Sequence, residues 1–157
     1  DNYLTSIWKD VIDRIEEMSN TTYKENPESI RIIADHIRTA VFISADYSGI
    51  KPSNTDQGYI LRRLIRRMVR HLNKLQIDLS ELSNLIDLNI DVLKEMYPEL
   101  VDNKETIKQT IIEEKDKFIK TLSHGEKEFD KVVNKLNASK ICPLKNIFGM
   151  DSSCSDM

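Results

Sequence analysis

The chain has 157 residues, a length that suits one domain with a buried core. Its four glycines, four prolines and 31% charged residues are typical of amphipathic helices and exclude a protein built mainly from β-strands. The formal net charge of -3 excludes a uniformly basic nucleic-acid-binding protein, so any such function must depend on local charge.

Two helices and a long loop are predicted in the N-terminal part of the chain. Apolar residues recur every three or four positions over residues 4–18, so we expect a helix that ends near residues 19–20. The second helix should begin with Asn26 as its cap and Pro27 as its first residue. Its buried stripe is expected to be Ile30, Ile33, Ile37, Ala40 and Val41. Residues 45–57 then form the one long turn-rich stretch, and loops of this kind often carry function.

A third helix, predicted over residues 58–74, has one apolar and one basic face at about 100° per residue. The apolar side chains are Leu61, Leu64, Ile65, Met68 and Leu72. The other face carries Arg62, Arg63, Arg66, Arg67, Arg70 and Lys74, with no acidic residue between Asp56 and Asp78. Because guanidinium groups bind phosphate bidentately, we predict that the five arginines share an exposed surface that binds an RNA backbone. A solvated face, or ion pairs with neighbouring acidic helices, is the alternative explanation.

Two further helices complete the prediction. Residues 79–97 fit a fourth helix, interrupted near Leu88 and Asn89 and ended by Pro98, with a connector over residues 97–100. A long helix should follow from residue 102 to about residue 136, in which Gly125 is a weak point or a close packing contact. We therefore predict an all-α helical bundle with an Arg-rich helix and a long C-terminal helix. It should form one domain over residues 1–137, followed by an irregular tail over residues 138–157.

No catalytic or metal-binding motif is apparent. The sequence has no glycine-rich phosphate loop, nucleophile elbow or His-Glu-x-x-His motif, and His36, His71 and His124 lie far apart along the chain. Cys142 and Cys154 are too few for a disulfide framework or a zinc site, and we interpret them as free thiols of a reducing compartment. Without an apolar run of membrane-spanning length or a signal-type leader, we expect a cytoplasmic protein with no membrane partner.

Four motifs follow one another along the chain. They are R-I-I-A-D-H-I-R at residues 31–38, P-S-N at residues 52–54, G-Y-I-L-R-R-L-I-R-R at residues 58–67, and an E-x3-F-x2-T-L-x2-G pattern that begins at Glu114. Together they resemble the successive signatures of alanyl-tRNA synthetases just after the catalytic domain. The resemblance covers residues 1–136, and the first and third runs are specific in combination.

The resemblance implies the central helical segment of a class II enzyme that uses ATP and Mg²⁺ to attach alanine to tRNA. Such a segment binds the acceptor stem of tRNA(Ala) and recognises its G·U wobble pair, and it adjoins the catalytic and editing domains of the parent enzyme. We expect the segment alone to be catalytically inactive, with no cofactor, no metal and no DNA partner.

The resemblance also implies two base contacts. In a G·U pair the guanine amino group is free in the minor groove, where an oxygen acceptor can bind it. Asn54 matches the base-contacting asparagine of the family, although a turn or cap residue is its alternative role. Asp151 stands for the second contact, an aspartate, but the tyrosines, glycine and proline that surround it in the family are missing here. Near Asp56 and Gln57, where relatives carry Gly-Arg, one basic contact is expected to be lost.

A second function remains open at this point. In this alternative, the chain is a helical interaction protein. Its arginines dock an acidic protein partner, and its long C-terminal helix packs against another chain. Binding to acceptor-stem RNA that depends on the wobble pair separates the two interpretations, because an interaction module predicts no such dependence.

Overall fold

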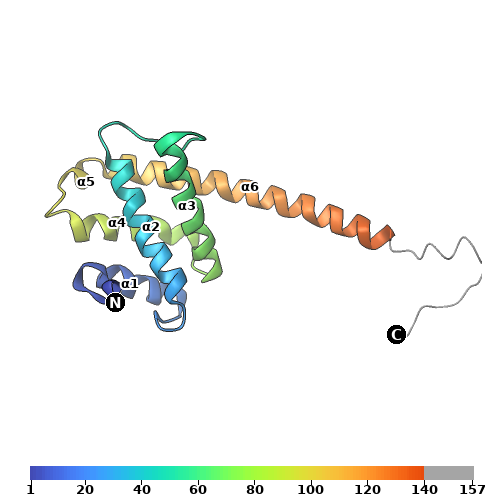
Figure 1. Ribbon diagram of the computed structural model, residues 1–157, viewed down its shortest axis with the longest axis horizontal. Coiled ribbons are helices and arrows are strands. Elements are labelled where there is room, and N and C mark those ends of the chain that lie inside the picture. The colour runs from blue at the N-terminus through green and yellow to red at the C-terminus, as the bar shows by residue number, and fades with distance from the viewer. Residues whose placement is uncertain (140–157) are drawn as a thin grey trace, which may run out of the picture. The chain divides into compact units, whose positions relative to one another are not determined.

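The structure is a computed structural model that describes residues 1–139, and within this range the chain is helical with no strand (Figure 1). The elements are η1 (Asn2–Leu4), α1 (Ser6–Ser19), α2 (Pro27–Ala45), α3 (Asp56–Lys74), η2 (Leu79–Glu81), α4 (Leu82–Leu93), α5 (Glu99–Asp102) and α6 (Lys104–Ser139). The predicted all-α class is confirmed. Asp151, Cys142 and Cys154 lie outside the described residues, and the irregular tail stays a prediction.

The chain divides into two compact units, Asp1–Phe118 and the residues from Ile119 onward. In the first unit, α2 and α3 form the most extensive helix pair. The predicted apolar stripe of α2 is completely buried: Ile30, Ile33, Ile37, Ala40 and Val41. Leu61, Ile65, Met68 and Leu72 of α3 are equally inaccessible, whereas Leu64 is only half-buried. The periodicity of these two helices therefore identified the core between them, apart from Leu64.

The ends of α1 and α2 lie close to their predicted positions. α1 ends at Ser19, and Asn20 follows in the left-handed conformation with φ of 51°, which closes the helix. α2 begins at Pro27 after Asn26, but the side chain of Asn26 makes no capping bond to the helix. Its Nδ2 instead donates to Oγ1 of Thr21 at 2.7 Å. Asn26 is therefore the N-cap residue, as predicted, although its side chain binds the preceding loop and makes no bond to the helix.

The predicted interruption of the fourth helix at Leu88 and Asn89 was also wrong. α4 is continuous through both residues, and Asn89 is completely buried. Its Nδ2 donates to the carbonyl of Leu85, one turn earlier, at 2.9 Å. An asparagine inside a helix can bind its amide nitrogen in this way without breaking the helix, although Oδ1 of Asn89 is buried without a hydrogen-bond partner in the described residues. α4 ends at Leu93, and the predicted connector contains the short helix α5.

The loop between α2 and α3 closes against the first turn of α3. The amide of Ser53 donates to the carbonyl of Gly58 at 3.0 Å, and Oγ of Ser53 donates to the carbonyl of Thr55 at 2.8 Å. A Cβ atom on Gly58 would overlap both the carbonyl oxygen of Lys51 and Oγ of Ser53. Only a glycine at this position lets residues 51–54 lie so close to the helix.

Gly58→Ala is expected to lower the free energy of unfolding by about 1–2 kcal/mol, the usual cost of overpacking, despite the better helix propensity of alanine. Gly125→Ala is the matched control, because its added Cβ meets nothing within 4 Å. That change should instead raise the stability of α6 by up to about 1 kcal/mol. Urea unfolding followed by circular dichroism measures both. A gain of stability for both variants would contradict the close approach of the loop.

Candidate nucleic-acid interface

The five predicted arginines project from one helix, α3, which has no acidic residue after Asp56. Arg63, Arg67 and Arg70 are exposed, while Arg62 and Arg66 are half-buried. Within residues 1–139, no carboxylate lies within ion-pair distance of Arg62, Arg63, Arg67 or Arg70. We call these four residues the basic face.

Arg66 differs from the basic face because it is bound inside the protein. Its Nε donates to Oε1 of Glu114 on α6 at 2.7 Å, and the side chain of Glu114 is only 4% exposed. The guanidinium carbon also lies 5.2 Å from the ring centroid of Phe118, within the range of a cation–π contact. The alternative given for the arginines, an intramolecular ion pair, therefore applies to Arg66.

Asn54 lies exposed in the loop that precedes α3. Its Oδ1 accepts a hydrogen bond from Nη1 of Arg62, which places the amide beside the basic face. Thr55 is the N-cap residue of α3, so the capping role considered for Asn54 was wrong. An amide oxygen has two lone pairs, so Oδ1 can accept a second donor while it stays bound to Arg62.

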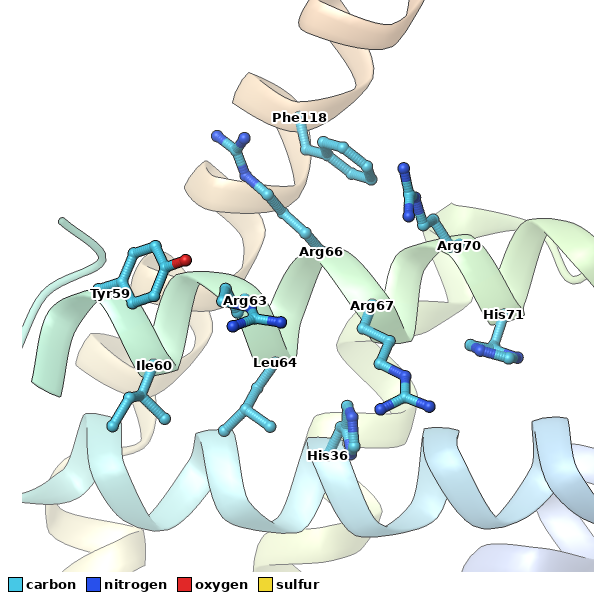
Figure 2. Close-up of a pocket in the computed structure, with 10 residues that line it drawn as sticks. All are labelled: His36, Tyr59, Ile60, Arg63, Leu64, Arg66, Arg67, Arg70, His71 and Phe118. Carbon is cyan, nitrogen blue, oxygen red and sulfur yellow. The ribbon is translucent and has the colours of Figure 1, made fainter. Parts of the chain in front are cut away.

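A groove of about 600 Å³ opens beside α3 (Figure 2). Its lining is rich in guanidinium and imidazole side chains and contains no carboxylate. The lining residues are His36, Tyr59, Ile60, Arg63, Leu64, Arg66, Arg67, Arg70, His71 and Phe118. Figure 2 shows Arg67 extending from α3 toward His36 on α2, and Arg66 extending toward Phe118. An anion of suitable size can therefore meet several N–H donors at once in this groove.

The groove brings together two histidines that lie far apart in the sequence and that no sequence motif connects. Nδ1 of His36 lies 3.2 Å from Oδ2 of Asp35, and Nδ1 of His71 lies 3.1 Å from Oγ of Ser29. Their common location depends on the packing of α2 against α3, which helical periodicity within each segment does not encode. The arginines one turn from His71 were the one local signal that this histidine lies on a basic surface.

Both histidines are expected to be neutral at pH 7. Burial lowers the pKa of His36, and the charge of Arg67 acts in the same direction, whereas Asp35 opposes both. Burial also lowers the pKa of His71, together with the charges of Lys74 and Arg67. The positive charge in the groove is therefore carried by guanidinium groups.

Residues 1–139 show neither a metal-binding cluster nor a membrane-spanning helix. No cluster of three or more His, Cys, Asp or Glu side chains in this range has the arrangement of a metal site. None of the helices described is long and apolar enough to cross a membrane.

Comparisons with known proteins agree with the resemblance in the motifs. The family model described as tRNA synthetases class II (A) matches residues 1–153. The chain is 44% identical over 142 residues to the alanine--tRNA ligase of Borrelia hermsii, a match that covers 88% of the chain and 24% of that relative. It is 39% identical over 137 residues to the alanine--tRNA ligase of Thermotoga maritima, covering 85% of the chain and 16% of the relative. The chain thus spans a quarter or less of the length of these relatives.

Proposed function

Because this chain belongs to the class II (A) tRNA synthetases, as a domain of the alanyl-tRNA synthetase type, we propose that it binds the acceptor stem of tRNA(Ala). In this proposal the parent enzyme is an alanine--tRNA ligase that uses ATP and Mg²⁺, and its catalytic and editing domains adjoin the chain. The chain itself contributes RNA binding and recognition of the G·U wobble pair.

One observation carries the proposal: the basic face offers four guanidinium groups without carboxylate partners in residues 1–139, directly beside Asn54. Guanidinium groups fix the position of a protein on a nucleic-acid backbone, whereas a contact to a base edge reads the sequence. The basic face supplies the guanidinium groups for the backbone, and Asn54 supplies a side chain that can contact a base edge. An acidic protein partner would use the arginines but gives no role to an exposed amide oxygen held at their edge.

The salt dependence of binding tests the basic face. If each of its four arginines neutralises one phosphate, the slope of log K against log salt should be about -2.8 to -3.6, from about 0.7 to 0.9 per contact. Arg70→Gln should reduce this slope by about one contact. Fluorescence anisotropy with an acceptor-stem hairpin at several salt concentrations measures both values.

Lys94→Gln is the matched control for charge. Lys94 follows α4, which packs on α1 and α2, and it pairs with Asp91 in an exposed ion pair. Its loss should leave the slope unchanged. A slope near zero for the unchanged chain, or equal binding to G·U and G·C stems, would favour docking of an acidic protein partner instead.

A further inference from the structure

The groove beside α3 contains imidazole groups in addition to arginines of the basic face. Arg63, Arg67 and Arg70 reach it from α3, and it also contains the imidazoles of His36 and His71. In each imidazole Nδ1 already faces a protein oxygen, on Asp35 and Ser29 respectively. Nε2 is therefore the ring nitrogen left for a ligand in the groove.

The charges around the two histidines favour a bound anion. On α2, Asp35 lies beside His36, and Glu28 acts on His71 from a distance. On α3 the charged groups are Arg63, Arg66, Arg67, Arg70 and Lys74. From α6 the lining side chain is Phe118, which is uncharged, and nearby Glu114 is paired with Arg66. The cations outnumber the carboxylates, so an imidazole in this groove gains a proton far more readily once an anion enters.

A backbone phosphate fits this chemistry. Its two unesterified oxygens accept hydrogen bonds from guanidinium and from protonated imidazole, and such charge-assisted bonds are about twice as strong as neutral ones. The groove is open and shares Arg63, Arg67 and Arg70 with the basic face, so one RNA strand can contact both. Building on the proposed function, we propose that the groove holds a backbone phosphate of the acceptor stem between Arg67, His36 and His71, and that these imidazoles take up protons when RNA binds.

Affinity measured between pH 7.5 and pH 5.5 tests this proposal, because histidine is the side chain that ordinarily titrates in this range. The hairpin should bind roughly tenfold more tightly at pH 5.5 than at pH 7.5, at constant ionic strength, as proton uptake by one or two histidines allows. In the absence of RNA, lowering the pH over the same range should instead reduce the free energy of unfolding. The lowered pKa values of His36 and His71 mean that the unfolded chain binds more protons as the pH falls below the ordinary histidine value.

Three variants test which histidines cause the pH dependence of hairpin binding. His71→Gln should lose a large part of the pH dependence, and His36→Gln together with His71→Gln should abolish it. His124→Gln is the matched control, because His124 is exposed and lies outside the Asp1–Phe118 unit. Since His36 is buried and its replacement can unfold the chain, the unchanged chain is also followed by NMR. Bound hairpin should raise the titration midpoints of the His36 and His71 ring protons and leave that of His124 in place.

The outcomes separate the two proposals. A hairpin that binds with the same affinity at pH 7.5 and pH 5.5, and shifts neither histidine midpoint, overturns the phosphate site and leaves stem binding intact. A hairpin that binds at no pH overturns the proposed function and the phosphate site together.

Discussion

Arg66→Met is expected to lower the free energy of unfolding by about 3 kcal/mol, the low end of the range for breaking a buried ion pair. The side chain of Glu114 is only 4% exposed, and its carboxylate would lose its partner at 2.7 Å. The side chain of Arg66 is 32% exposed, so water partly screens the pair and the loss stays near the low end. Methionine keeps an unbranched apolar stem at this position, so the change removes mainly the guanidinium group and its contacts with Glu114 and Phe118. Urea unfolding followed by circular dichroism measures the loss.

Two variants test the cause of that loss. Arg70→Met removes an exposed arginine of the same helix and should change stability by about 0.5 kcal/mol or less. Replacing Glu114 with leucine in the Arg66→Met background should restore most of the stability, because an apolar pair of similar volume often equals a buried ion pair. If Arg66→Met and Arg70→Met lose equal stability, Glu114 is not held by Arg66 in solution.

Asn54→Ala should weaken binding to a G·U acceptor stem by about 1–3 kcal/mol, the usual size of a specific base contact. The variant loses the oxygen that accepts the guanine amino proton in the minor groove. Against a G·C stem, where that amino group is already paired, the loss should be much smaller. Anisotropy with the two hairpins measures the difference. Asn54→Asp keeps an acceptor oxygen and should keep the preference for G·U.

Arg62 and Arg70 make the specificity test sharper. Arg62→Ala removes the hydrogen bond to Oδ1 of Asn54 and should lower both affinity and discrimination. Arg70→Gln, which loses an exposed arginine, should weaken both stems alike. Arg66 is unsuited as this control, because its ion pair with Glu114 couples its loss to stability. Equal weakening of both stems by Asn54→Ala would mean that Asn54 is only a loop residue.

The sequence predicted what depends on local periodicity. The buried stripe of α2 and the arginines of α3 follow from the helical repeat, since residues three and four apart share a face. The bond of Arg66 to Glu114 joins α3 to α6, and the groove places His36 of α2 near arginines of α3. Because these residues lie far apart in the chain, the periodicity of a single helix cannot predict that they meet. Asn89 shows a related limit: a break was predicted near this residue, but its Nδ2 donates to the carbonyl of Leu85 and α4 continues through it.

The proposed site residues differ in whether the sequence or the structure pointed to them. The position of Asn54 came from the resemblance alone, and its contact with Arg62 emerged only in the folded loop. The two groove histidines were missed because each is unremarkable among its sequence neighbours. Asp151, the other proposed base contact, stays a prediction because it lies outside the described residues.

The hydrogen bond between Arg62 and Asn54 holds the side-chain amide of the loop against α3, a straight and rigid helix. From Arg62 to Arg70 the helix rises by about 12 Å, and its arginines recur at intervals close to one 5.4 Å turn. Once these side chains engage a backbone, the helical rise fixes how far along the stem the amide can reach. The domain would then act as a ruler that selects a base pair by its distance from the gripped phosphates, before any hydrogen bond tests its identity.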